Sequence, residues 1–348
     1  MKEFPRSLLI LIAFTILAVV ACGPAAATAT GQPGSNPGTG DAPAAPGVQH
    51  QLVPAGLPPE RSGHAGDQDS SSMASQKRAP GGDRFTFDTF ERPFNADTMD
   101  VYFSYLDIQD VVIYQDDTWV YAVITVKGTD TNGALPGKYA VELDLDANGR
   151  GDWFVLVDHP ASTEWSTDGV QVWTDANGDV GGSTVGASDK TVSGGDGYET
   201  LVFGQDHQSD PDAAWARISP DDPHTIQLAG KRSLLGGDTA YLAGLWTGNE
   251  DLNPTLFDLN DHFTHEQAGA ALTELQYFYP IKQVSELDNT CRMAVGFVPT
   301  GNEPGLCDTG EPGTCKPPPG GCTQNGYKWS SKFCCCSWEG TYGCDYVP

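Results

Sequence analysis

Hydrophobic and polar residues alternate through the middle of the chain with the two-residue period of a β-strand. Residues 118–126 are mostly aromatic or β-branched, a composition that favours strands. In residues 138–145 the apolar side chains fall on one face and the acidic side chains on the other. Residues 153–157 form a short uninterrupted apolar run, which indicates a strand buried on both faces. Further strands are predicted at 169–173, 197–203, 225–229 and 239–246.

This pattern predicts an all-β domain. Turn-forming residues separate the strands, and the only helix that the pattern suggests is short, at residues 265–276. Many short strands with turns between them are typical of an antiparallel β-sandwich, here expected to be jelly-roll-like. We assign the sandwich to residues 85–310, because aromatic residues become frequent from Phe85 onward.

The first residues have the pattern of an export signal. Lys2 and Arg6 precede an apolar run at residues 8–21, which is too short for a stable transmembrane helix and suits a signal peptide. The run ends in small and aliphatic residues directly before Cys22, which resembles a bacterial lipobox. The resemblance implies that residues 1–21 are removed and that Cys22 is lipidated. The exported chain would then be anchored at the outer face of a bacterial membrane or cell surface. An ordinary secretory signal with an incidental cysteine is the alternative.

Residues 22–84 predict a disordered tether. They contain no Phe, Trp or Tyr and are rich in Gly, Pro, Ala, Ser and Thr. Such a segment buries too little apolar area to offset an ordering cost of about 1–2 kcal/mol per residue. We therefore expect it to hold the folded part away from the membrane.

The charge of the chain limits its partners. Its 348 residues include 46 Asp and Glu against 19 Lys and Arg, a formal charge of −27. Nucleic-acid binding needs clustered Lys and Arg, and an anionic membrane surface would repel this chain. We expect no nucleic-acid partner and contact with a membrane only through the lipid anchor.

The most informative motif lies in residues 144–152. Oxygen-bearing side chains stand at positions 1, 3, 5 and 9 of this loop, and Gly149 at position 6 permits a sharp turn. Ca²⁺ prefers six to eight oxygen ligands at about 2.3–2.6 Å. Position 12 is Val155, not the glutamate of an EF-hand, so the loop is closer to the Asp-rich calcium turns of secreted proteins. The predicted ligands are Asp144, Asp146, Asn148, Asp152 and the backbone carbonyl of Arg150.

A second loop repeats the sequence Asp-Ala-Asn-Gly at residues 175–178. Its predicted calcium ligands are Asp175, Asn177 and Asp179, although Val180 stands where the first loop has glycine. For the first loop a simpler interpretation is open. Asn148-Gly149 is a favoured two-residue hairpin turn, and its acidic neighbours would then only be solvated.

The cysteines predict disulfides, because an exported chain oxidises its thiols. Cys291 and Cys307 enclose a short loop, and their pairing would constrain the unfolded chain by about 3 kcal/mol. Residues 311–348 have too few residues for a core of their own and are expected to form a small disulfide-rich unit. Its cysteines, whose connectivity stays open, are Cys315, Cys322, Cys334, Cys335, Cys336 and Cys344.

Aromatic residues provide candidate ligand contacts. Trp165 lies in the predicted sandwich, and Trp329 and Trp338 lie in the cysteine-rich tail. Exposed aromatic rings are typical of sugar or protein contacts. Core packing, or covering of the disulfides in the tail, is the alternative.

One segment resembles known secreted modules. Residues 114–124, with the sequence Tyr-Gln-Asp-Asp-Thr-Trp-Val-Tyr-Ala-Val-Ile, and residues 139–146 resemble the central strands of family 9-like carbohydrate-binding modules and of DOMON domains. Those domains are β-sandwiches that bind sugars or haem, and the resemblance covers about residues 105–205. It implies a sugar ligand more than haem, because Met99 and Met293 have no evident His partner. The wider stretch 84–310 looks like a module of bacterial surface lipoproteins.

Together these features favour a non-catalytic lipoprotein at the cell surface that recognises a glycan and contains structural calcium. One alternative is a structural or adhesive protein whose cysteine-rich tail contacts a surface protein. Another is a secreted glycoside hydrolase, which needs two carboxylates about 5–10 Å apart. The sequence has no G-x-S-x-G or H-E-x-x-H motif, and the carboxylates available to a hydrolase are Glu142, Glu164, Asp168 and Glu199.

Overall fold

The computed structural model describes most of the chain between residues 50 and 307. The described residues are 50–76, 83, 85, 88–180, 197–205, 207–257, 259–269, 281–301, 303–307, 327–330 and 335–338. The predicted signal peptide with Cys22, most of the tether, and Cys315, Cys322, Cys334 and Cys344 lie outside them. Among the described residues, no helix combines the length and the apolar character that crossing a membrane requires.

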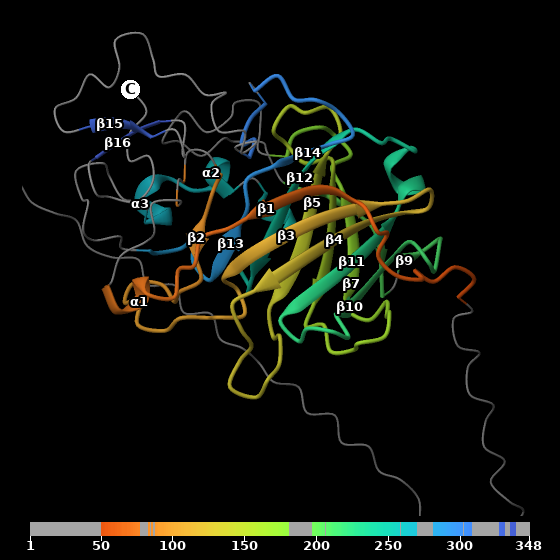
Figure 1. The fold of residues 1–348 in the computed structure, drawn as a ribbon, viewed down its shortest axis with the longest axis horizontal. Helices are drawn as coiled ribbons and strands as arrows, with labels where there is room; N and C mark the ends of the chain where they lie inside the picture. The colour runs from red at the N-terminus through yellow and green to blue at the C-terminus, as the bar shows by residue number, and fades with distance from the viewer. Residues whose placement is uncertain are drawn as a thin grey trace, which may run out of the picture. The chain divides into compact units, whose positions relative to one another are not determined.

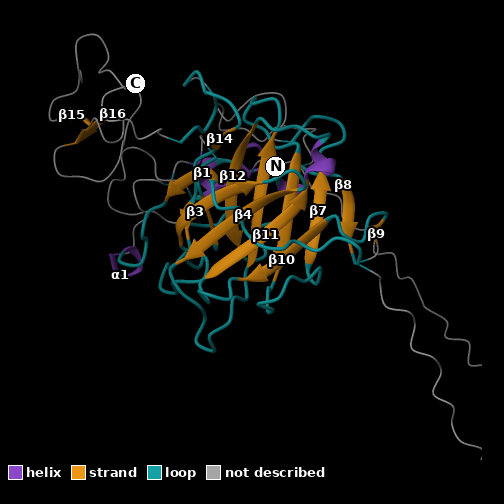
Figure 2. Cartoon of the chain, turned by 45° about the vertical axis from the view of Figure 1, so that its right-hand side comes forward, coloured by secondary structure: helices purple, strands orange, loops and turns teal. Residues whose placement is uncertain are grey.

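The described domain is an antiparallel β-sandwich, which confirms the predicted fold class (Figure 1). Its first sheet has five strands in the order β1-β3-β4-β11-β10. These strands are β1 Arg61–Gly66, β3 Ile108–Gln115, β4 Trp119–Val126, β11 Thr225–Lys231 and β10 Ala214–Ile218. Figure 2 shows this sheet in front of strands of the second sheet.

The second sheet has nine strands, eight of them in the order β2-β13-β12-β5-β6-β7-β8-β9, and β14 also pairs with β12. These strands are β2 Glu91–Arg92, β13 Leu287–Asn289, β12 Tyr241–Gly248, β5 Lys138–Asp144, β6 Trp153–Asp158, β7 Val170–Thr174, β8 Thr200–Gly204, β9 His207–Gln208 and β14 Met293–Val295.

Helical segments in the described residues are short. They are α1 Met73–Gln76, α2 Leu259–His262 and α3 His265–Ala268, with 3-10 turns at Arg232–Leu235 and Pro254–Leu256. Within the predicted helix at 265–276, the structure describes α3 as far as Ala268, and residues 270–280 lie outside the described part. In the tail, β15 Tyr327–Ser330 and β16 Cys335–Trp338 form an antiparallel hairpin in which Trp329 stands opposite Cys336.

The main core lies between the two sheets, and the alternation along the strands builds it. Val120, Ala122 and Ile124 of β4 face this core together with Val141 of β5 and Val155 of β6. Because side chains alternate between faces, each of these strands contributes every second residue to the inner layer.

The opposite face of the nine-stranded sheet is covered as well. Phe154 and Trp246 on this face pack with Phe257 from a loop, and all three are buried. Strand β6 is therefore buried on both faces, as its uninterrupted apolar run predicts. The acidic face of β5 is not solvent-exposed, since Glu142 and Asp144 are each only 1% exposed.

The sandwich begins earlier than the sequence indicates. Strand β1 pairs along β3, from Gly66 opposite Asp110 to Arg61 opposite Tyr114. The prediction of a tether through residue 84 is thus wrong for residues 61–66. The physical reason is that an edge strand is held by backbone hydrogen bonds, and of the six residues of β1 only Ala65 joins the core.

Candidate functional site

The first acidic loop, residues 144–152, connects β5 to β6. The two strands pair up to Leu143 opposite Trp153, so the connection is long and the two-residue hairpin alternative is wrong. Asp144 Oδ2 accepts a hydrogen bond from the Gly149 amide at 2.7 Å, and Asp152 Oδ2 accepts one from the Leu145 amide at 2.6 Å. The loop is therefore folded around its own carboxylates.

Three of the predicted ligands meet in this loop. Asp144, Asp146 and Asp152 each place a carboxylate oxygen within 4.8 Å of the other two. The side-chain oxygen of Asn148 instead accepts a hydrogen bond from the Arg150 amide at 2.8 Å. Burial raises the pKa of Asp144 to about 6, because the charged form loses hydration. Burial also raises the pKa of Asp152, and the neighbouring carboxylates add to this increase.

The second acidic loop, residues 175–180, follows β7. Asp175 Oδ1 accepts from the Gly178 amide and its Oδ2 accepts from the Val180 amide, both at 2.7 Å. The carboxylates of Asp175 and Asp179 converge with Glu199, within 4.8 Å of one another. Glu199 thus joins the predicted pair, and it lies too far along the sequence for a local motif to include it.

The two acidic loops are joined to each other. The Asp175 amide donates to the Asp152 carbonyl at 3.1 Å, and the Thr174 hydroxyl donates to the same carbonyl at 3.1 Å. Arg150 donates from its guanidinium to the Val180 carbonyl at 2.5 Å. Six carboxylates are consequently gathered at one end of the strands β5, β6 and β7.

Glu142 is the centre of a buried polar network beside these loops. Its Oε1 accepts from the Tyr198 hydroxyl and its Oε2 from the Trp246 indole N–H, each at 3.1 Å. Arg292 lies 3.5 Å from Oε2 and 3.7 Å from a carboxylate oxygen of Asp88. The pocket beside this network has space for about one water molecule.

The four carboxylates that the sequence offers to a glycoside hydrolase do not form one site. Glu142 pairs with Phe154 near the start of β6, whereas Glu164 and Asp168 are exposed in the loop that follows the end of β6. Glu199 belongs to the second acidic loop.

We expect Gly151→Ala to destabilise the domain by about 1–3 kcal/mol, the range for overpacking. A Cβ atom at this position would lie 1.8 Å from the Tyr198 hydroxyl and 2.5 Å from the Glu142 side chain. Urea unfolding followed by tryptophan fluorescence measures the change. Gly56→Ala is the matched control, because a Cβ there meets nothing within 4 Å. Equal stability of the two variants would contradict the close packing.

The outer face of the five-stranded sheet has an aromatic row. The strand register places Tyr114, Tyr121, Ala229 and Trp215 side by side across β3, β4, β11 and β10. Trp165 packs against this row, with its ring centroid 6.2 Å from that of Tyr121.

Trp165 is the predicted ligand contact whose surroundings the structure describes. It is partly buried, and the guanidinium carbon of Arg217 lies 4.4 Å from its ring centroid. Trp215 is 4% exposed and its ring centroid lies 4.6 Å from that of His50, so it serves packing.

Comparison with protein-family models, curated protein sequences and solved structures finds no match to this chain. Functional inference therefore rests on its own residues: the joined acidic loops, the Glu142 network and the outer aromatic row.

Proposed function

We propose that this chain is a non-catalytic binding module, exported and lipid-anchored at a bacterial cell surface, that binds calcium in its acidic loops and recognises a glycan. The observation that carries the proposal is the junction of the two acidic loops, which collects six carboxylates in two groups of three. The predicted lipobox at Cys22 supports the location.

The geometry of the loops favours calcium over other cations. All six side-chain ligands are carboxylates, and oxygen ligands with irregular geometry suit Ca²⁺. Two ligand oxygens of one calcium ion lie at most about 5 Å apart, twice the usual bond length, and both groups satisfy this limit. Asp144 and Asp175 already accept backbone hydrogen bonds, so the loops are preformed. Oδ2 of each accepts a single bond and keeps a second lone pair for an ion.

The Glu142 network supports a binding role over hydrolysis. Glu142 is fully engaged by Tyr198, Trp246 and Arg292, and the adjoining pocket holds about one water. A sugar ring needs far more room, since ligand pockets typically measure about 300–1,000 Å³.

The outer aromatic row supports a glycan as the ligand. Tyr114 and Trp165 are only partly buried, and Arg217 beside Trp165 donates to Gln227 at 2.7 Å. A flat ring next to planar polar groups is typical of sugar contacts, because C–H groups of the sugar pack on the ring while its hydroxyls form hydrogen bonds. The resemblance of residues 114–124 to carbohydrate-binding modules points in the same direction.

We expect millimolar calcium to raise the melting temperature, and we expect Asp146→Asn/Asp179→Asn to remove most of the increase. At a calcium concentration tenfold above the dissociation constant, each site adds about 1.4 kcal/mol, or about 3–6 °C for a domain of this size. Differential scanning calorimetry in calcium and in EGTA measures it. The control Asp117→Asn/Asp168→Asn changes two exposed carboxylates outside the loops. An equal calcium response in both double variants would refute the loop sites.

We expect glycan arrays probed with the unaltered chain to show binding that Trp165→Ala weakens by about tenfold, since one stacked ring contributes on the order of 1–2 kcal/mol to a contact. Trp173→Phe is the control, because Trp173 packs in the buried layer behind the other sheet and donates to Gln171. An array without any bound glycan, in calcium, would exclude the glycan and leave the loop sites untouched.

A further inference from the structure

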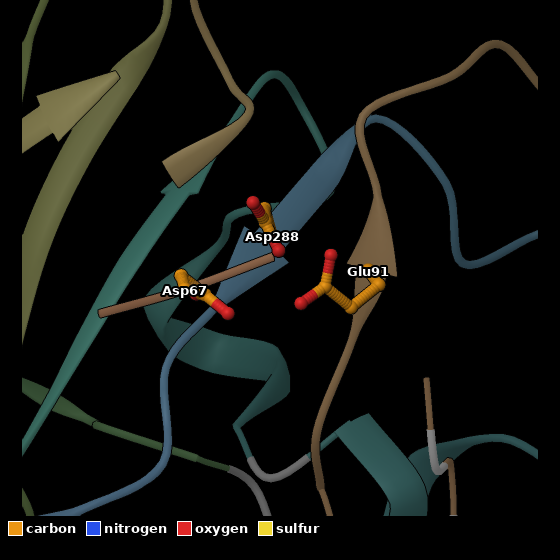
Figure 3. Close-up of side chains that lie close together, drawn as sticks. All are labelled: Asp67, Glu91 and Asp288. Atoms are coloured by element: carbon orange, nitrogen blue, oxygen red, sulfur yellow. The ribbon is translucent and has the colours of Figure 1, made fainter. Parts of the chain in front are cut away.

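A third group of carboxylates lies away from the acidic loops, between the two sheets. Asp67 directly follows β1 of the five-stranded sheet, whereas Glu91 in β2 and Asp288 in β13 belong to the nine-stranded sheet. Glu91 and Asp288 are direct cross-strand partners, so their side chains share a face of the sheet. Figure 3 shows the three carboxylates converging on one point, and one oxygen from each lies within 4.8 Å of the others.

This triad, in which Glu91 and Asp288 are buried and Asp67 is partly buried, has too few hydrogen-bond donors. Asp288 is 0% exposed, its Oδ2 accepts from the Ile108 amide at 2.8 Å, and its Oδ1 is buried with no hydrogen-bond partner. Oδ2 of Asp67 is likewise buried without a partner. Glu91 is 4% exposed and accepts one bond, from the Ser70 hydroxyl at 2.9 Å. Buried oxygens without a donor are rare in folded proteins and require a neutralising group.

No basic side chain among the described residues forms an ion pair with the triad. Arg92 follows Glu91 in β2, but its Nε lies 3.0 Å from Asp83 and its Nη1 donates to the carbonyls of Ala268 and Val284. Lys127 pairs with the exposed carboxylate of Asp69. Asp107, also buried nearby, accepts from Tyr102, Gln109 and the Ser70 amide, so it adds negative charge and no donor.

A single proton shared within the triad would leave one of its oxygens without a hydrogen-bond donor. One proton between Asp67 and Glu91 would complete that pair, and Asp288 Oδ1 would still lack a donor. Three carboxylates therefore need either several protons or one divalent cation.

We propose that Asp67, Glu91 and Asp288 bind a calcium ion that holds the end of β1 against the nine-stranded sheet. Three hard oxygens at this spacing match ligands about 2.4 Å from one ion, and water can complete the shell. Strand β1 is an edge strand that pairs only with β3 among the described strands. The chain already contacts the domain before β1, where the Gln51 and Leu52 amides donate to Asp212. The ion would thus add a link between the two sheets at the end of this edge strand. This site shares no residue with the acidic loops and does not rest on the function proposed for them.

Calcium-45 equilibrium dialysis of the full chain tests the site. We expect Asp67→Asn to bind one ion fewer than the unaltered chain, or to bind it at least about tenfold more weakly. In the Asp146→Asn/Asp179→Asn background, which lacks two loop ligands, the remaining calcium should disappear on adding Asp67→Asn. Asp69→Asn is the control, because Asp69 lies two residues away and contacts Lys127. Unchanged stoichiometry and affinity in Asp67→Asn would overturn the proposal, whatever the loops bind.

Thermal unfolding separates an ion ligand from a purely structural residue. We expect Asp67→Asn to unfold at the same or a higher temperature than the unaltered chain in EGTA, because one of three crowded carboxylates is removed. In saturating calcium the order should reverse. If Asp67→Asn were less stable in both conditions by the same amount, its role would be structural and the proposal would fail. If calcium shifted neither protein, protons would neutralise the triad, and the proposal would fail as well.

Crystals of the unaltered chain grown in calcium provide a measurement that needs no variant. An anomalous peak about 2.4 Å from oxygens of the three carboxylates would support the site. Ordered carboxylates with no peak between them would overturn it.

Discussion

Glu142→Ala should lower the free energy of unfolding by about 3–5 kcal/mol, the range for breaking a buried ion pair. The substitution removes the acceptor of the Tyr198 hydroxyl and of the Trp246 indole N–H and leaves these donors buried. It also removes the carboxylate that lies 3.5 Å from the guanidinium of Arg292, a side chain in a residue only 7% exposed. Urea unfolding monitored by circular dichroism measures the change.

Two further variants define what the Glu142 carboxylate contributes. Glu142→Gln keeps an acceptor oxygen and removes the charge, so we expect a smaller loss, about 1.5–3 kcal/mol. Glu164→Ala removes an exposed carboxylate and should change stability by no more than about 0.5 kcal/mol. A Glu142→Ala protein as stable as Glu164→Ala would show that the network contributes little. Glycosidase turnover abolished in Glu142→Gln would instead restore a catalytic role for this residue.

Removing the bond between Cys291 and Cys307 should cost about 3 kcal/mol, the loop-closure value for about fifteen residues. The structure forms this predicted disulfide, with a sequence separation of 16. The enclosed segment contains β14 and Arg292, whose amide donates to the Gly305 carbonyl at 2.8 Å. Its Pro304 also lies against Gly149 of the first acidic loop. Loss of the bond should therefore loosen that loop as well as lower the unfolding free energy.

Cys291→Ala/Cys307→Ala is the suitable variant, because both cysteines are partly buried against the apolar core. Chemical denaturation of this variant and of the unaltered chain, each with and without reductant, measures the effect. Any reductant effect that persists in the double variant comes from the cysteines of the tail. An unaltered chain no more stable than the double variant under oxidising conditions would contradict the prediction.

Local patterns in the sequence predict much of the sandwich. The strands around Val123, Val141 and Val155 were predicted because alternation and apolar runs express directly which faces are buried. The bond between Cys291 and Cys307 was predicted because both residues lie on one short loop. The edge strand Arg61–Gly66 was missed, since backbone pairing with β3 leaves little trace in side-chain hydrophobicity.

The burial and grouping of the acidic side chains depended on the tertiary structure more than the strands did. The acidic face of β5 predicts that this face is exposed to solvent. In the structure a further layer containing Trp246 and Phe257 covers it, so Glu142 is a buried hydrogen-bond acceptor. The first acidic loop was recognised as a cluster of oxygen ligands because Asp144, Asp146 and Asp152 are neighbours in sequence. Glu199 was not assigned to the second loop, because only the pairing of β7 with β8 brings it there.

The sequence by itself thus determined the all-β class, most core strands, one disulfide and the local carboxylates of each acidic loop, because each depends on residues close together along the chain. The tertiary structure alone decided which polar groups are buried and which distant residues meet. Asp67, Glu91 and Asp288 are the clearest case: they come from both sheets and more than two hundred positions separate the first from the last. Their proximity follows from strand pairing and sheet packing, which no local spacing of residues expresses.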